Sequence, residues 1–262
     1  MPAPQNAFKA ALNSGQPQMG CWVGLADAYS AEITASAGFD WLLIDCEHAP
    51  NDLRSMTAQL KVVEASTSKP VVRVPIGETW MIKQFLDAGA QSLLVPMVES
   101  KAQAEELVSA VRYPPVGVRG VGSALARASG FSAIPDYLTT AYGEICLLVQ
   151  VENRAGLADL DGILSVDGVD GVFIGPSDLA ADMGHLGDPM HPEVVAAILD
   201  AMKRIKAAGK APGILTTNLD FARTCLELGA TFVATSIDVT LYAAAIRGAA
   251  RQAKELLGSV EG

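Results

Sequence analysis

The chain has 262 residues, of which half are hydrophobic and only 18% are charged, and this composition excludes an intrinsically disordered protein. The formal net charge is −10 and no basic stripe is present, so nucleic acid is not an expected partner. No apolar run approaches the roughly 20 residues that cross a bilayer, and no secretory signal is visible. The four cysteines are scattered and form no C-x-x-C pair, which favours reduced thiols in a cytoplasmic protein.

Short apolar runs alternate with amphipathic segments along the whole chain. Strands are predicted over residues 19–23, 41–45, 71–74, 92–96, 146–152, 171–174, 212–215 and 232–236. Most of these runs are continuously apolar, as expected for parallel strands that are covered on both faces. Glycines precede several of them, as is typical where a helix ends just before a strand. The pattern predicts an α/β protein, a (β/α)8 TIM barrel in which residues 1–262 form a single domain.

One connection breaks this alternation. Residues 112–143, between the fourth and fifth predicted strands, are too many for a simple link. Long segments of this kind are usually lids or interface loops. The glycines at 120 and 122 match neither the dinucleotide-binding fingerprint nor a Walker A motif. Packing against a neighbouring subunit and a lid role remain equal alternatives.

Two acidic residues lie at the ends of neighbouring predicted strands. Glu152 closes the run CLLVQVE, and Asp178 closes the run GVFIGPSD. All strand ends of a barrel face one mouth, so both carboxylates are expected to converge there. Two carboxylates with positions left for water and substrate suit Mg²⁺ or Mn²⁺. The alternative for Asp178 is a cap on the following helix.

The turn after the second predicted strand carries an acid and a histidine three residues apart, Asp45 and His48. An acid that orients an imidazole is a recurring arrangement for proton transfer. Two alternatives stay open: Glu47 adjoins His48 and is a second candidate partner, or Asp45 caps the turn while His48 lies on the surface. Arg73 is the other unusual residue, because an arginine within a buried strand must meet an anion. Its alternative role is a structural ion pair.

Further residues at strand ends are expected to bind substrate. Gly175 and Ser177 begin a predicted helix whose free N–H groups suit a carboxylate. Trp22 is expected to form an apolar wall, although a lone tryptophan is often plain core. Gln150 shares a strand face with Glu152, and Leu215 ends the seventh predicted strand.

Other candidate chemistry is less favoured. The chain has only three histidines, His48, His185 and His191, so histidine-rich zinc ligation is not expected. His185 and His191 are interpreted as structural or lid residues. No lysine falls at the carboxyl end of a predicted strand, where a Schiff-base lysine would be needed. A metal-free imine aldolase is therefore not expected.

Five longer stretches are distinctive. They are GFDWLLIDCEHAP (38–50), LVPMV (94–98), YPPVGVRGVGSA (113–124), GVDGVFIGPSDL (168–179) and KAPGI (210–214). Together they resemble the class II pyruvate aldolases of the HpcH/HpaI family, typified by 4-hydroxy-2-oxoheptanedioate aldolase. The resemblance covers nearly the whole chain. Two residues depart from the family pattern: Cys46, where glycine is usual, and Ser177, where alanine is common.

The resemblance implies a role for each residue singled out above. Glu152 and Asp178 match the metal ligands, with Mg²⁺, Mn²⁺ or Co²⁺ as the cation. Arg73 matches the arginine that contacts the pyruvate oxygen, and His48 with Asp45 matches the proton-transfer pair. The segment with Gly175 and Ser177 matches the one that holds the pyruvate carboxylate.

The implied reaction is reversible cleavage of a 4-hydroxy-2-oxo acid to pyruvate and an aldehyde, with a place in aromatic catabolism. The cation and Arg73 are expected to stabilise the pyruvate enolate. His48, directly or through a water molecule, is expected to take the 4-hydroxyl proton. Two other hypotheses are a citrate-lyase-type enzyme that cleaves a coenzyme A thioester, which a nucleotide-sized basic groove would favour, and a non-catalytic barrel.

The resemblance also implies assembly. We expect a homohexamer, a trimer of dimers in which the last helix is exchanged between barrels. Residues 241–257 carry Leu241, Ile246, Leu256 and Leu257 among many alanines, which suits close helix packing. Sequence alone does not give the number of subunits, since symmetric closure is compatible with several.

Overall fold

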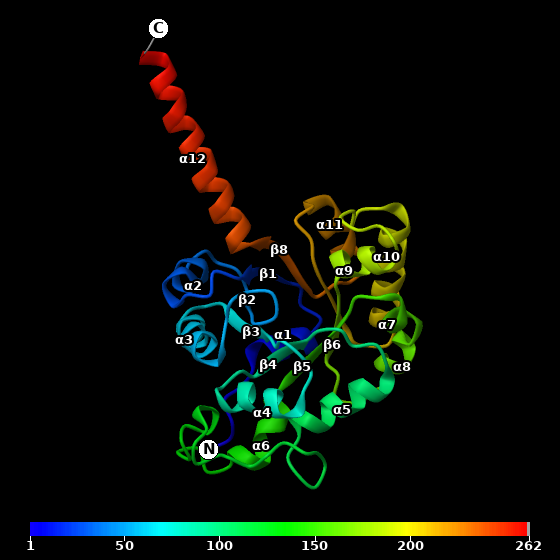
Figure 1. Ribbon diagram of the computed structural model, residues 1–262. Helices are drawn as coiled ribbons and strands as arrows, with labels where there is room; N and C mark the ends of the chain where they lie inside the picture. The colour runs from blue at the N-terminus through cyan, green and yellow to red at the C-terminus, as the bar shows by residue number, and fades with distance from the viewer. Residues whose placement is uncertain (261–262) are drawn as a thin grey trace.

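The computed structural model describes residues 1–260, with side chains as far as residue 256. Its parallel strands close into one eight-stranded barrel in the order β1 to β8, with helices outside them (Figure 1). The strands are β1 Gln18–Val23, β2 Trp41–Asp45, β3 Lys69–Arg73, β4 Ser92–Val95, β5 Cys146–Val151, β6 Gly171–Ile174, β7 Ala211–Leu215 and β8 Phe232–Ile237. The predicted TIM-barrel fold is confirmed.

Helices connect the strands and cover their outer faces. They are α1 Ala7–Asn13, α2 Ala28–Ala35, α3 Leu53–Glu64, α4 Thr79–Asp87, α5 Lys101–Val111, α6 Tyr137–Glu144, α7 Arg154–Ala158, α8 Leu160–Leu164, α9 Pro176–Asp182, α10 Pro192–Ala207, α11 Leu219–Glu227 and α12 Asp238–Val260, with a 3-10 turn, η1, at Arg127–Ser129. Their apolar faces and the outer faces of the strands form the largest core cluster. Each strand is thus buried on both sides, which explains its continuous apolar sequence.

All eight predicted strands are present, with ends that differ by at most two residues from prediction. The largest shift is in β3, which begins at Lys69 rather than at residue 71. Lys69 and Pro70 interrupt the apolar pattern, yet they pair with Trp41 and Leu42 of β2. Hydrogen bonding to the neighbouring strand therefore extends β3 beyond the apolar run.

Aromatic side chains fill the interior of the barrel. Trp41 and Phe232 pack edge-on with ring centroids 6.1 Å apart, and Phe8 of α1 closes the end where the strands begin, with its ring 5.9 Å from that of Trp41. Gly20 lies so close to Trp41 that an added Cβ would be 2.1 Å from the indole. Small residues on one strand thus make room for large rings from the next.

The long connection at 112–143 contains η1 and leads into α6, and it packs beside α3 and α4 (Figure 1). Arg127 of η1 forms an ion pair with Glu64, the last residue of α3. The N-terminal segment joins the same region, since Asn6 N donates to Glu144 Oε2 at 2.7 Å. Within the described residues this segment does not line the mouth of its own barrel. The lid role within one chain is therefore wrong, and the interface role stays a prediction.

The last helix, α12, projects away from the barrel (Figure 1). Three of its large side chains, Leu241, Tyr242 and Ile246, are 53–59% exposed. The side chain of Leu257, also expected on this surface, lies outside the described part of the chain. Over the described residues, no helix combines the length and the apolar character that crossing a bilayer requires.

Candidate active site

A hollow of about 460 Å³ opens at the carboxyl ends of the strands. Residues from β1, β2, β3, β5, β6, β7 and β8 and the segments that follow them line it, and nine of them were predicted from the sequence: Trp22, Asp45, His48, Arg73, Gln150, Gly175, Ser177, Asp178 and Leu215. The tenth predicted residue, Glu152, lies directly beneath this lining and is hydrogen-bonded to Gln150. The barrel therefore brings all the predicted site residues to one place.

Asp45 and Arg73 form a buried ion pair with two hydrogen bonds at the mouth. They are directly opposite in the β2–β3 pairing, and Arg73 Nε and Nη2 donate to the two Asp45 oxygens at 2.9 and 2.6 Å. Burial alone would raise the pKa of Asp45, but the hydrogen bonds and charge of Arg73 outweigh it and keep that pKa below its ordinary value. This two-point contact fixes the guanidinium plane at the mouth.

The expected orientation of His48 by Asp45 is wrong. The Asp45 carboxylate is occupied by Arg73 and by the backbone N–H groups of Glu47 and His48. The acid nearest the imidazole is Glu47, with 3.9 Å between His48 Nε2 and Glu47 Oε2. A bidentate arginine contact is stronger than a contact with an imidazole at the surface, and the His48 side chain is 66% exposed.

Glu47 is more closely involved in the charge network of the site than the sequence indicated. Its Oε2 atom lies 2.8 Å from Arg73 Nη1, but it is buried without a hydrogen bond of good geometry. Burial raises the pKa of Glu47, and the charges of Asp45 and Asp178 raise it further, against the opposing effect of Arg73. Arg73 therefore pairs with Glu47 as well as with Asp45.

Glu152 is the most deeply buried acid of the site, with 2% exposure. Its Oε1 accepts from the N–H of Met97 at 2.9 Å, and its Oε2 accepts from the Gln150 amide. Burial raises the pKa of Glu152 to about 7, and the negative charges of Asp178 and Glu47 act in the same direction. This carboxylate is thus held by two donors, and among the described residues it forms no ion pair.

The loop after β6 approaches Glu152 closely. A Cβ on Gly175 would be 2.5 Å from Glu152 Oε2, so only glycine fits this position. Pro176 begins α9, and Asp178 lies in its first turn. The N–H groups of Ser177 and Asp178 have no carbonyl partner within the helix there, and both residues line the hollow.

The residues fit a divalent cation. The acids Asp45, Glu47, Glu152 and Asp178 gather around a single strongly basic residue, Arg73. Buried carboxylates need a compensating positive charge, and oxygen donors are the ligands that Mg²⁺ and Mn²⁺ prefer. The raised pKa of Glu152, which forms no ion pair among the described residues, marks the side of the hollow where such a charge is missing.

Sequence reasoning missed part of the lining. Ile237, Val239 and Thr240 also line the hollow, from the end of β8 and the start of α12. The predicted eighth strand ended at residue 236, one residue too early to include Ile237. Buried Asp238 explains the placement, because it accepts from the N–H groups of Gly24 and Leu25 and so ties the ends of β8 and β1 together. With the strand extended by one residue, the rule that strand ends face the mouth would have predicted Ile237 as a lining residue.

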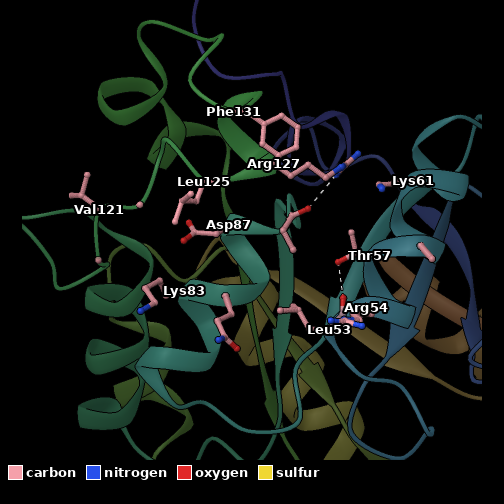
Figure 2. A pocket seen from close by; sticks show the side chains of 16 residues that line it. Leu53, Arg54, Thr57, Lys61, Lys83, Asp87, Val121, Leu125, Arg127 and Phe131 are labelled. Carbon is pink, nitrogen blue, oxygen red and sulfur yellow. Dashed lines mark hydrogen bonds between the residues drawn. The ribbon is translucent and has the colours of Figure 1, made fainter.

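A larger hollow of about 690 Å³ lies outside the barrel, between α3, α4 and residues 120–131. Figure 2 shows Val121, Leu125 and Phe131 along the left and upper edges of it, Arg54 and Lys61 on the right, and Lys83 below Val121. The three apolar side chains are 63–89% exposed. This hollow was not expected from the sequence, and none of the predicted site residues lines it.

Comparison with known proteins agrees with this geometry. The sequence profile described as HpcH/HpaI aldolase/citrate lyase matches residues 18–245. The chain belongs to the HpcH/HpaI family. It is 60% identical over 247 residues to a protein of Roseovarius nubinhibens named hydroxypyruvate/pyruvate aldolase, covering 94% of this chain and 96% of that protein. It is 57% identical over 239 residues to a Salmonella dublin protein named 4-hydroxy-2-oxo-heptane-1,7-dioate aldolase, covering 91% of each.

A solved structure places the fold in the same family. An HpcH/HpaI aldolase/citrate lyase family protein from Burkholderia cenocepacia is 40% identical, with a TM-score of 0.90 over 95% of this chain and 100% of that one. As a member of the HpcH/HpaI family with relatives named aldolases at 57–60% identity, the chain is an enzyme of the carbon–carbon lyase class. The non-catalytic hypothesis is therefore set aside.

Proposed function

We propose that the chain is a class II pyruvate aldolase, which reversibly cleaves 4-hydroxy-2-oxo acids to pyruvate and an aldehyde. The observation that supports the proposal most strongly is that Glu152, Asp178 and Arg73 converge on one hollow. The names of the Roseovarius and Salmonella relatives support the same substrate class. The four free, buried cysteines fit a cytoplasmic enzyme.

Glu152 and Asp178 would hold the cation, Mg²⁺ or Mn²⁺, with Co²⁺ as a further candidate. When bound, the cation supplies Lewis-acid stabilisation of negative charge on the substrate oxygens. Gln150 and the Met97 N–H orient Glu152 for this task, since both donate to its carboxylate.

Arg73 would bind the keto oxygen of the substrate. Cleavage of the C3–C4 bond sends its electron pair into the enolate of pyruvate, and negative charge develops on that oxygen. Asp45 already holds the Arg73 guanidinium in place. No free energy is therefore needed to reorient this donor when the charge appears. The first-turn N–H groups at Ser177 and Asp178 would receive the substrate carboxylate, while Trp22 and Leu215 form the apolar wall.

His48 would remove the 4-hydroxyl proton. Its exposed imidazole lines the hollow, and Glu47, rather than Asp45, is the neighbouring carboxylate that can stabilise its charged form. The deprotonated 4-hydroxyl oxygen then becomes the carbonyl oxygen of the released aldehyde, and His48 keeps the proton.

The function is tested by pyruvate release from 4-hydroxy-2-oxoheptanedioate and from a shorter 4-hydroxy-2-oxo acid. We expect release that stops after chelator treatment and returns with Mg²⁺ or Mn²⁺. A coenzyme A thioester of a citrate-like acid serves as the competing substrate. Cleavage of the thioester alone would favour the citrate-lyase-type hypothesis, and chelator-resistant pyruvate release would exclude a metal-dependent aldolase.

His48→Ala is expected to impair aldol cleavage more than proton exchange at the methyl group of pyruvate. Cleavage requires removal of a hydroxyl proton, whereas pyruvate has no hydroxyl group to deprotonate. Rates of both reactions can be measured on one preparation, with His185→Ala as a histidine control outside the hollow. Equal losses in the two reactions would show that His48 is not a base dedicated to the hydroxyl.

We also infer a homohexamer, built as a trimer of dimers, with α12 exchanged between barrels. The projecting helix exposes Leu241, Tyr242 and Ile246, and the outer hollow in Figure 2 offers an apolar wall on the barrel. Exposed apolar patches of this kind mark protein interfaces. The segment at 112–143, next to this hollow, would then face an adjacent subunit.

Light scattering at micromolar concentration is expected to give the mass of a hexamer. Ile246→Asp should lower that mass, because it places a charge in the inferred interface, while Gln252→Asp on another face of α12 should leave it unchanged. A fully active monomer would exclude both the assembly and a site shared between subunits.

A further inference from the structure

A second cluster of metal-ligating side chains lies outside the mouth, in the connection between α9 and α10. It consists of His185, His191 and Glu193, each of which offers one ligand atom within 4.8 Å of the others. Within the described residues this is the one group of three or more histidine, cysteine and acidic side chains whose ligand atoms all lie this close together. Neither the aldolase chemistry nor the assembly inferred above uses these residues.

The direct contacts within the cluster are specific. His185 Nε2 lies 3.0 Å from Glu193 Oε2, and His191 Nδ1 accepts from the Glu193 N–H at 3.4 Å. The two imidazoles are stacked, with ring centroids 3.5 Å apart and planes 14° from parallel. One carboxylate oxygen and two imidazoles are therefore in mutual contact.

The backbone holds these side chains in place. His185 N donates to Ala180 O at 2.7 Å, and His191 N donates to Asp188 O at 3.1 Å. Gly184 and Gly187 adopt φ values of +90° and +82°, which let the chain make two successive tight turns. Pro192 then fixes the first turn of α10. The turns of this one connection thus bring the ligand atoms together.

We propose that His185, His191 and Glu193 form a zinc-binding site. Two imidazoles and one carboxylate are an established zinc ligand set, and zinc accepts three protein ligands with water in the fourth position. Glu193 has a side chain that is 71% exposed, so its carboxylate can adjust by rotation and solvent can supply the water. Mg²⁺ prefers oxygen ligands and octahedral geometry, so this site should discriminate against it.

An ion bound at this site would stabilise the connection between α9 and α10. The connection at 183–191 joins α9, which carries Ser177 and Asp178, to α10. An ion held by His185 at one end of this connection and by His191 and Glu193 at the other would fasten it. Because zinc would bind the folded loop and have no such site in the unfolded chain, it should raise the melting temperature.

The test uses untagged, chelator-treated protein and Zn²⁺ or Co²⁺ as the probe. We expect the wild-type chain to bind one ion more than the His185→Ala chain in equilibrium dialysis. Co²⁺ at the extra site should give the intense visible absorption of four-coordinate cobalt, which a six-coordinate carboxylate site lacks. His48→Ala, which removes the remaining histidine of the chain, should retain that absorption.

Glu193→Gln provides a second variant at an exposed position, so a folding defect in a histidine variant would not decide the outcome. Loss of a group that merely supports a metal ligand costs roughly 10- to 100-fold in affinity, and loss of the ligand itself should cost at least as much. Equal zinc stoichiometry and unchanged cobalt absorption in His185→Ala and Glu193→Gln would overturn the proposal. The cluster would then be only a helix cap and an ion pair. Aldolase activity is not a readout, so this test is independent of the proposed function.

Discussion

Glu152→Gln is expected to lower kcat for pyruvate release by at least about a thousandfold, because a metal ion supplies several kcal/mol of charge stabilisation and about 1.4 kcal/mol corresponds to a factor of ten. The amide keeps the shape of the side chain but removes a charge from a metal ligand. The barrel should remain folded, since the substitution removes a carboxylate whose charged form is disfavoured by burial. Initial rates at saturating Mn²⁺ and circular dichroism measure the two effects.

The pH dependence of cation binding provides a second readout of the same residue. Burial raises the pKa of Glu152 to about 7, so below that pH the cation must displace a proton. Binding should therefore tighten as the pH rises toward 7 and level off above it. Glu152→Gln should flatten this dependence.

Asp170→Asn is the matched control for Glu152→Gln. Asp170 also has a pKa raised by burial, but it immediately precedes β6, at the end of the barrel opposite the mouth, where it pairs with Lys9 at 3.2 Å. We expect this variant to keep its kcat even if its stability falls. Comparable loss of activity in both variants would show that a buried carboxylate matters for the fold rather than for the chemistry.

Arg73→Ala is expected to lower kcat by about 10²- to 10³-fold, the usual cost of removing one donor to a developing oxyanion. Metal binding should persist, because Glu152 and Asp178 are untouched. The substitution also leaves Asp45 and Glu47 without their cation, so some loss of stability is expected as well.

Two further variants separate these effects. Arg73→Lys keeps the charge but not the two-point contact, and it should restore stability more fully than it restores kcat. Asp45→Asn combined with Arg73→Ala removes one of the unpaired charges and should recover stability without recovering turnover. A near wild-type kcat in Arg73→Ala would make Arg73 a structural ion pair.

The sequence predicted the barrel well because each strand is buried on both faces and therefore appears as a continuous apolar run. It also placed Glu152, Asp178 and Arg73 at the mouth, since the strand ends of a barrel all face one way. It did not predict the contacts among these side chains. That Asp45 meets Arg73 depends on the register of β2 and β3, which no local pattern encodes.

Two other features could not be predicted from the sequence, for related reasons. Glu47 is central because two neighbouring strands bring its carboxylate beside Arg73. His185 and His191 stack because the chain turns at Gly184, just before His185, and again at Gly187, between the two histidines. In both cases the decisive contact comes from the path of the backbone in space, whereas residue type and spacing show only which groups are available.

The central claim is that one divalent cation binds between Glu152 and Asp178 at the mouth of the barrel. Anomalous diffraction from a crystal soaked with Mn²⁺ and pyruvate locates the cation directly. The account predicts a manganese peak in contact with both carboxylates, with pyruvate beside it and Arg73 directed at its keto oxygen. A peak confined to the cluster of His185, His191 and Glu193, or pyruvate bound away from Arg73, would contradict it.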